Sequence, residues 1–441
     1  MVLEEILSIL PSKVPYDKSS DSKVLTPLKV AHEMIDALPD EVWTRNIKII
    51  DICCKSGVFL YEAYLKLMES KEIISEFPDR RERHFHIINN QLYGLCPDEQ
   101  CQFISMRTVY GQLRENSNII YIKDYSSIIN NVDKSFLYET LKKEFGTMQF
   151  NIVITNPPYN RGMDLDFVDL AYKLSTDYTV AITPAKWQTA APDQRIASKI
   201  SYGEFRAKYV PHMSQVVFYP DCGNVFKISQ VDGITWYVMD KEIHEKCKVI
   251  NKCNNQKHYN SVAIRNIRER ESLSNVGVEI VHSLGEYEQF KFKPSLPKRY
   301  QVWTNNQLTI GGQGGQTNYL LSTEGMHNVI SISRIIDTYL GETCPSGASS
   351  MSFTSDSREE CENFVSWLNT KFTRFFVAIN ISKLTGIINN DCFRFVPAPP
   401  LNPDTNTYDW SHPYTDEFLY DYYKVSPEHQ SIINSVIRER K

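Results

Sequence analysis

Between residues 46 and 182, short apolar runs alternate with stretches of helical periodicity, and this alternation constrains the fold more than any other feature. The apolar runs predict strands at residues 46–52, 91–95, 118–122, 150–155 and 178–182. The intervening stretches predict helices at residues 58–68, 98–110 and 166–174. Such alternation is typical of a mostly parallel sheet with helices on both faces, so the predicted fold class is α/β.

Length and composition favour a folded protein of two or three domains. The chain has 441 residues, of which 42% are hydrophobic and 23% are charged, and this excludes a disordered or fibrous chain. Its apolar runs are shorter than the roughly 20 residues that a membrane-spanning helix needs. Glu4 and Glu5 stand where a signal peptide would carry positive charge. Ten cysteines without a C-x-x-C spacing predict reduced thiols and no metal site. We therefore expect a cytoplasmic protein without a membrane partner.

The texture of the sequence changes after about residue 241. Strand-like stretches at residues 278–282, 300–303, 331–335 and 393–396 are separated by turns rich in glycine and proline, and a helix is predicted at residues 358–380. These patterns predict a second, mixed α/β domain. The expected boundaries are residues 1–245 for the first domain, 246–400 for the second and 401–441 for a C-terminal tail.

Positive charge is concentrated in residues 246–300. This segment holds eleven Lys or Arg and five acids, a net charge of +6 in a chain whose net charge is -5. Such a segment is typical of a module that binds a polyanion, and a solvated basic face is the alternative. The candidate contacts are Arg265, Arg268 and Arg270, whose spacing could line one face of a strand or a helix, together with Lys298 and Arg299. The glycines of residues 311–315 could bring a loop close to a nucleic-acid backbone or form a flexible surface loop.

Asn156-Pro157-Pro158-Tyr159 follows the predicted strand at residues 150–155. Two prolines fix the backbone and lack N–H groups, so their carbonyls and the asparagine oxygen form a rigid set of acceptors. An exocyclic amino group needs such acceptors, and the ring of Tyr159 offers a face on which a planar base can stack. The alternative is a turn that only ends the strand.

The residues from Asp51 to Gly57 link a predicted strand to a predicted helix. Small residues in such a turn let the backbone approach a ligand at the helix N-terminus. The segment is neither G-x-G-x-x-G nor a P-loop, so a purely structural turn is the alternative. Asp51 itself could either contact the ligand or only cap the helix.

Together these motifs resemble S-adenosylmethionine-dependent N6-adenine DNA methyltransferases of the restriction-modification type, in the gamma motif order. The resemblance is carried by Thr26-Pro27, by residues 51–60 (DICCKSGVFL), 118–125, 156–159 and 183–187, and by residues 224–238. It implies a Rossmann-like methyltransferase sheet with helices on both faces in a catalytic domain of residues 1–245. Residues 246–400 would then be the target-recognition domain that binds double-stranded DNA.

The resemblance also implies roles for single residues. Asn156, Pro157, Pro158, Tyr159 and Phe226 are the expected catalytic residues, and no metal is expected. The residues expected to bind S-adenosylmethionine are Thr26, Pro27, Asp51, Cys53, Ser56, Gly57, Asp98, Asp124, Tyr125 and Asn156. Three loop residues depart from the family pattern, because Ile52, Cys53 and Lys55 replace proline, alanine and glycine. Cys96 stands where an acid usually binds the ribose hydroxyls, and that role passes to Asp98.

The implied activity is methyl transfer to the N6 amino group of a flipped adenine in a specific DNA sequence. An RNA-base or protein-glutamine methyltransferase is the alternative enzyme, because both use the same tetrapeptide. A non-catalytic nucleic-acid-binding subunit is the third possibility. We find no nuclease motif, so a restriction nuclease would be a separate partner chain.

Overall fold

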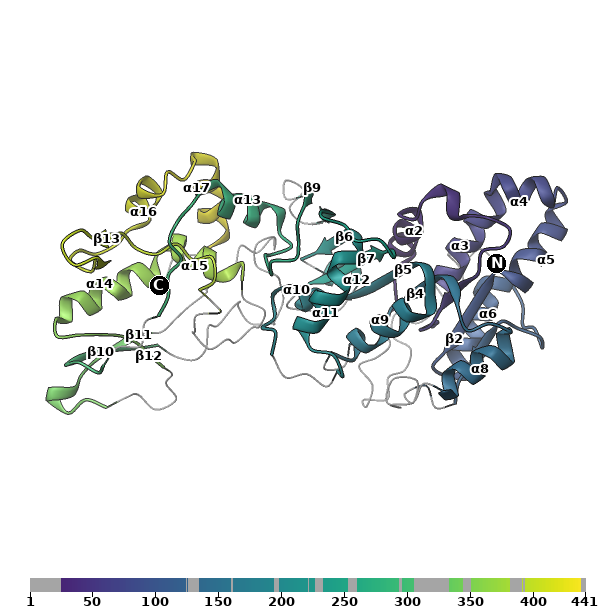
Figure 1. Ribbon diagram of the computed structural model, residues 1–441, viewed down its shortest axis with the longest axis horizontal. Helices are drawn as coiled ribbons and strands as arrows, with labels where there is room; N and C mark the ends of the chain where they lie inside the picture. Colours follow the sequence, from purple (N-terminus) through teal and green to yellow (C-terminus); the bar gives the residue numbers. More distant parts are fainter. Residues whose placement is uncertain are drawn as a thin grey trace. The chain divides into compact units, whose positions relative to one another are not determined.

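The fold is described from a computed structural model (Figure 1). It describes residues 25–123, 125, 135–159, 162–193, 198–220, 222–226, 233–252, 260–292, 296–304, 333–343, 350–380, 391 and 393–437. Contacts divide the chain into two compact units. The first contains residues 1–184, 192–217 and 235–248, and the second contains residues 185–191, 218–234 and 249–441. The main division thus lies close to the predicted one at residue 245, but two short segments before it belong to the second unit.

The first unit is built on a sheet whose strands follow the order β3-β2-β1-β4-β5-β7-β6. Strand β1 pairs in parallel with β2 and β4, and the pairs β2–β3 and β4–β5 are parallel as well. The strands are β1 (Ile49–Asp51), β2 (Leu92–Cys96), β3 (Ile119–Tyr121), β4 (Phe150–Thr155), β5 (Ser175–Pro184), β6 (Met213–Tyr219) and β7 (Ile234–Met239). The α/β class predicted from the alternation is confirmed.

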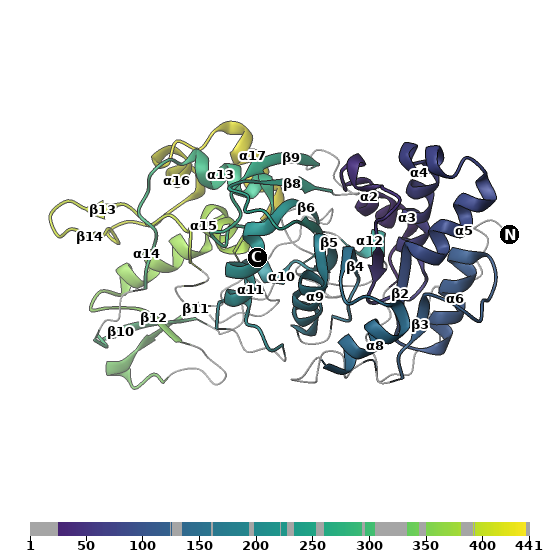
Figure 2. The same ribbon diagram turned by 45° about the vertical axis from the view of Figure 1, so that its right-hand side comes forward.

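Helices pack on this sheet. Helix α3 contacts β1 and β2, α6 contacts β2 and β3, and α9 contacts β4 and β5. Figures 1 and 2 show α9 beside β4 and β5. The helices of this unit are α2 (Leu28–Asp36), α3 (Val58–Glu69), α4 (Lys71–Glu76), α5 (Arg80–Asn90), α6 (Glu99–Tyr110), α8 (Ser135–Phe145), α9 (Met163–Leu174) and α11 (Tyr202–Tyr209). The described residues of this unit also include two 3₁₀ turns, η1 (Asp40–Val42) and η3 (Val210–His212).

The central strands are rich in apolar residues because both faces of the sheet are covered. In β4 every residue except Asn151 is buried. Phe150 and Val153 of this strand share one cluster with Tyr93 of β2 and Phe167 of α9. Since parallel strands end at the same edge of a sheet, the chain segments that follow β1, β2 and β4 begin side by side there.

The second unit has a mixed composition of helices and strands. An antiparallel sheet of order β11-β10-β12 packs against α14. Its elements are α10 (Lys186–Thr189), α12 (Gly223–Phe226), β8 (Cys247–Asn251), β9 (Ser261–Arg265), α13 (Asn275–Ser283), β10 (Tyr300–Thr304), β11 (Ser333–Asp337), η5 (Thr338–Leu340), β12 (Ser350–Ser355), α14 (Arg358–Asn369), α15 (Lys371–Ala378), β13 (Leu401–Asn402), β14 (Thr407–Tyr408), α16 (Asp416–Tyr422) and α17 (Pro427–Val436). Within the described ranges, no helix is long and apolar enough to cross a membrane.

Residues 401–437 do not form a separate tail. Trp410, Leu419 and Ile433 are buried in the same core as Phe364 and Trp367 of α14. The predicted boundary at residue 400 therefore does not correspond to a division between the compact units. Proline-rich sequence suggested a linker there, but the aromatic residues that follow it anchor the chain end in this core.

Three further element predictions are wrong in the second unit. The stretch 278–282 is part of α13, whose first turn is capped by the Ser274 side chain on the Gly277 N–H. A short apolar run does not distinguish a buried strand from a buried helix. The helix predicted at residues 358–380 is two helices, because Thr370 ends α14 and its side chain caps α15. Residues 393–396 lie mostly in turns, and residues 311–315 lie outside the described residues.

Candidate active site

Asn156 directly follows β4, at the edge where the parallel strands end. Its side chain is buried, and the amide Nδ2 donates a hydrogen bond to Thr26 Oγ1 at 2.9 Å. The amide Oδ1 accepts a hydrogen bond from the Tyr159 hydroxyl at 3.0 Å. These two bonds fix both ends of the amide, so its oxygen has a defined position beside the half-buried Tyr159.

Thr26 and Pro27 lie at the start of α2. Pro27 is itself the N-cap residue of α2, and its carbonyl accepts hydrogen bonds from the Val30 and Ala31 N–H groups. Thr26 precedes the cap, and its buried hydroxyl bonds to Asn156. A proline without an N–H fits the start of a helix, and this placement leaves Thr26 available to hold Asn156.

The loop from Asp51 to Gly57 turns tightly between β1 and α3. Gly57 has φ of 75°, and a Cβ there would lie 3.0 Å from Ser105 Cα and 3.1 Å from Ser105 O. The Cys54 thiol donates to Ser105 Oγ at 3.3 Å. The prediction that this turn needs small residues is confirmed at Gly57. Only glycine suits both its positive φ and the short distance to the Ser105 backbone.

We expect Gly57→Ala to destabilise the protein by about 3 kcal/mol, because it combines the cost of a left-handed non-glycine residue with overpacking against Ser105. Gly111→Ala is the matched control. Gly111 has φ of 72°, but no atom lies within 4 Å of its added Cβ, so it should lose only about 1–2 kcal/mol. Equilibrium denaturation of both variants measures the difference, and equal losses would contradict the steric part of the explanation.

Asp51 ends β1 and is buried. Its Oδ1 accepts a hydrogen bond from the Cys53 N–H at 2.9 Å. Burial raises the pKa of this carboxyl to about 7, against the opposing effects of the Cys53 N–H and the Lys55 charge. The N-cap of α3 is Gly57, without a side-chain cap, so the alternative that Asp51 only caps this helix is wrong.

These residues surround one pocket. It is lined by Leu25, Thr26, Asp51, Cys53, Lys55, Ser56, Val58, Phe59 and Asn156. Three separate motifs thus contribute to one pocket. The predicted residues that line it are Thr26, Asp51, Cys53, Ser56 and Asn156. Lys55 was not predicted as a pocket residue. The apolar residues Leu25, Val58 and Phe59 were also missed, because their sequence pattern indicates only packing.

Tyr125 contacts the loop of residues 51–57 through its hydroxyl group. Its hydroxyl donates to the Ile52 carbonyl and lies 2.8 Å from Cys53 Sγ. Its ring stacks on Phe167 at 5.8 Å between centroids. Burial raises the pKa of this phenol well above its usual value. Tyr125 therefore positions the Cys53 wall of the pocket. Asp124, its predicted companion, lies outside the described residues.

Asp98 does not line the pocket. Its side chain caps α6 by accepting a hydrogen bond from the Cys101 N–H at 2.7 Å, and Cys96, which ends β2, is fully buried. The ribose role of Asp98 stays a prediction.

Phe226 ends α12 in the second unit, where it is buried and packs edge-on against Tyr219 with 5.5 Å between the ring centroids. Its role at a flipped base also stays a prediction.

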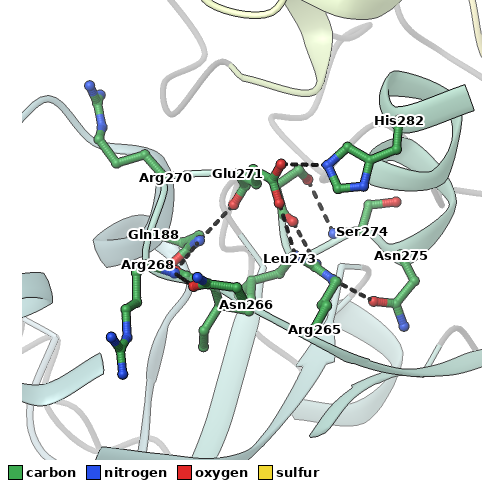
Figure 3. Close-up of polar contacts among 12 residues, drawn as sticks. Gln188, Arg265, Asn266, Arg268, Arg270, Glu271, Leu273, Ser274, Asn275 and His282 are labelled. Carbon is green, nitrogen blue, oxygen red and sulfur yellow. Dashed lines mark hydrogen bonds and ion pairs between the residues drawn. The ribbon is translucent and has the colours of Figure 1, made fainter. Parts of the chain in front are cut away.

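The three arginines treated as one group have different environments (Figure 3). Arg265 donates to Asn275 Oδ1 at 3.1 Å and to the Ser272 carbonyl at 2.7 Å. Arg270 forms two hydrogen bonds with the Asp391 carboxylate, at 2.8 and 3.1 Å. Arg268 has an exposed side chain, which points away from that of Arg270 in Figure 3.

The expectation of one shared arginine face is therefore wrong. β9 ends at Arg265, and Arg270 has φ of 55°, so no regular strand or helix spans the three. Lys298 and Arg299 also differ from each other. Lys298 Nζ lies 3.8 Å from an Asp356 carboxylate oxygen, and half of the Lys298 side chain is exposed. Arg299 binds the buried Asp337 at 3.1 Å, which lowers the pKa of that carboxyl.

A sequence model of the Eco57I restriction-modification methylase family matches residues 90–166, which include β2, β3, β4 and Asn156 to Tyr159. An uncharacterized adenine-specific methylase of Mycoplasma pneumoniae is 24% identical, over 40% of this chain and 58% of that protein. The chain therefore spans little more than half the length of this relative.

Two solved structures are also similar. One is the methyltransferase subunit of a type I restriction-modification system from Streptococcus thermophilus, with 13% identity, coverage of 56% of this chain and 50% of that one, and a TM-score of 0.37. The other is the M protein of the type I restriction enzyme EcoKI, with 13% identity, 76% and 67% coverage and a TM-score of 0.38. The family match and the adenine-specific relative confirm the resemblance predicted from the motifs, and the segment around Asn156 is similar to adenine methylases of restriction-modification systems.

Proposed function

We propose that this chain is a DNA methyltransferase that uses S-adenosylmethionine to methylate the N6 amino group of adenine. One observation carries the proposal: Asn156, the expected acceptor for the amino group, lines the same pocket as the loop expected to hold the cofactor. A turn that only ended a strand would not require its polar side chain to share a pocket with a buried carboxylate.

The lining of the pocket suits S-adenosylmethionine. Asp51 is a buried acid that can face a positive charge, and Ser56 and Thr26 are hydroxyl residues at the loop and at the start of α2. Phe59 and Leu25 provide apolar surface for the less polar part of the ligand. When bound, S-adenosylmethionine supplies a methyl group on a positively charged sulfur. Thr26, Asp51, Cys53 and Ser56 are the residues that we expect to hold it.

Asn156 acts on the amino group of the base. The lone pair of that nitrogen is delocalised into the adenine ring, so the nitrogen is a poor nucleophile. Hydrogen bonds to Asn156 Oδ1 and to the Pro157 carbonyl favour a nitrogen whose lone pair is localised, and they orient it for transfer. The bond from Nδ2 to Thr26 keeps the oxygen of the amide on the opposite side. The Tyr159 ring would stack on the base, which has to leave the duplex first.

The second unit would bind the duplex. Its sequence includes most of the segment with a net charge of +6, and phosphate contacts from such a segment would position the DNA without reading its sequence. Sequence reading would require further contacts with base edges in the grooves. In a restriction-modification system, the partner would be a restriction nuclease on a separate chain.

The function is tested by identifying the methylated base. DNA from cells that express the chain, and DNA and RNA treated with the purified protein, are digested and analysed by mass spectrometry. We expect N6-methyladenine in DNA, in a fixed sequence context on methylation-aware sequencing. Methylation of RNA or of a protein glutamine instead would support the alternative enzymes. No S-adenosylmethionine binding in calorimetry would support the non-catalytic subunit.

The environments of the three arginines predict different effects of their removal. Arg268→Ala should weaken binding to all DNA sequences alike and flatten the slope of log affinity against log salt by about 0.9, as expected for one lost phosphate contact. Arg270→Ala should instead destabilise the free protein by about 1–3 kcal/mol, because it leaves the Asp391 carboxylate without its two hydrogen bonds from Arg270. Binding assays at several salt concentrations and denaturation without DNA measure the two effects. An unchanged salt slope for Arg268→Ala would show that this side chain does not contact phosphate.

A further inference from the structure

Lys55 is a lysine in the wall of the candidate cofactor pocket. Only 8% of its surface is exposed, and it lies in the loop between Asp51 and α3. Lysine is rarely buried to this extent, because removing its charge from water is costly unless an opposite charge or polar groups compensate. Its place in the loop corresponds to a glycine in the family pattern, so the family resemblance assigns it no role.

The pocket has one acidic and one basic residue. Asp51 is 2% exposed, and the charge of Lys55 stabilises its ionised form. Cys53 also lies close enough for Lys55 to lower the pKa of its thiol, although burial raises that pKa to about 11. The remaining lining residues are uncharged. The pocket therefore offers one anion and one cation to a ligand.

This pair of charges matches a zwitterion. A ligand with a cationic centre and a carboxylate a few bonds apart can be held by both groups, whereas a purely cationic ligand would be attracted by Asp51 and repelled by Lys55. The methionine part of S-adenosylmethionine is such a zwitterion, since it combines an ammonium group and a carboxylate. S-adenosylhomocysteine keeps both groups but lacks the sulfonium charge.

We propose that Lys55 binds the carboxylate of the methionine part of the cofactor, so that the pocket selects an intact amino-acid end. The inference depends on the proposed function, because it assigns a residue to the same cofactor. The competing explanation is that Lys55 only balances the charge of Asp51. The two explanations differ for a ligand that lacks the carboxylate.

The experiment measures binding by calorimetry for wild type, Lys55→Met and Lys55→Arg with three ligands. The ligands are S-adenosylmethionine, S-adenosylhomocysteine and decarboxylated S-adenosylmethionine. We expect Lys55→Met to bind the first two about tenfold or more weakly, since it loses a charge-assisted hydrogen bond. It should bind the decarboxylated ligand as tightly as wild type or more tightly. Lys55→Arg should recover part of the lost affinity.

Lys66→Met is the matched control, because it removes one positive charge from α3 at a residue that pairs with Asp36 and does not line the pocket. It should leave all three affinities unchanged. Circular dichroism and thermal unfolding establish that each variant is folded.

The outcomes separate the two proposals. If wild type binds neither S-adenosylmethionine nor S-adenosylhomocysteine, the proposed function fails and this inference fails with it. If wild type binds them and folded Lys55→Met binds them equally well, only the inference is overturned. An equal loss for all three ligands would also overturn it, because Lys55 would then act through Asp51 or through the shape of the loop.

Discussion

Asn156→Ala is expected to lower the rate of methyl transfer by on the order of 10²-fold or more, in a protein that remains folded. The substitution removes the acceptor that orients and activates the amino group in the transition state. It also removes the hydrogen bond to Thr26, whose loss should cost about 1 kcal/mol of stability. Single-turnover kinetics with saturating cofactor measure the chemical step apart from binding.

Thr26→Val separates the two effects of this substitution. It removes the same hydrogen bond from Nδ2, but it leaves Asn156 Oδ1 and its bond from Tyr159 in place. Stability should therefore fall to a similar extent, while the rate falls much less than for Asn156→Ala. Near-normal turnover by a folded Asn156→Ala protein would contradict the proposed role of this residue. Equal rate losses in both variants would show that the position of the amide matters more than its oxygen.

The first half of the fold could be predicted because its sequence signals are local and consistent. The run of residues 150–155 is mostly apolar, and the Asn156 that follows it precedes two prolines, so β4 was predicted with its exact bounds. The turn at Gly57 was also predicted, since only a small residue fits a strand-to-helix turn of this kind. The strand and the turn depend on neighbours within a few residues, whereas the packing of Ser105 against Gly57 does not.

The rest depends on contacts between residues far apart in the chain. The spacing of Arg265, Arg268 and Arg270 does not show that Asp391, more than 100 residues later, holds the last of them. Likewise, Lys55 shares its pocket with Thr26 and Asn156, which come from other parts of the chain. Sequence spacing identifies candidate charges, whereas the partners of those charges are determined by tertiary packing.

Asp51 should make cofactor affinity depend on pH. Because its pKa is raised to about 7, the carboxyl is mostly protonated in the free protein below that pH. A bound cation favours the ionised form, so binding below pH 7 must release a proton. Affinity should then rise by up to about tenfold per pH unit as pH approaches 7, and become constant above it. Calorimetry in buffers of different ionisation enthalpy measures the released proton directly.

Asp51→Asn is the control, and stability provides a second measurement. An amide still accepts the Cys53 hydrogen bond but does not ionise. In wild type, the raised pKa means that Asp51 favours folding fully below its unfolded pKa of about 3.8, and that this contribution is lost as pH rises through about 7. Between pH 4 and 8 the stability of Asp51→Asn should therefore rise relative to wild type by up to about 4 kcal/mol.

Over the same range the variant should bind S-adenosylmethionine more weakly, without the proton release due to Asp51. Because the ligand also titrates, the comparison uses the difference between the two proteins. Parallel stability curves would show that Asp51 is already ionised in the free pocket, and an unchanged affinity would remove it from the cofactor site.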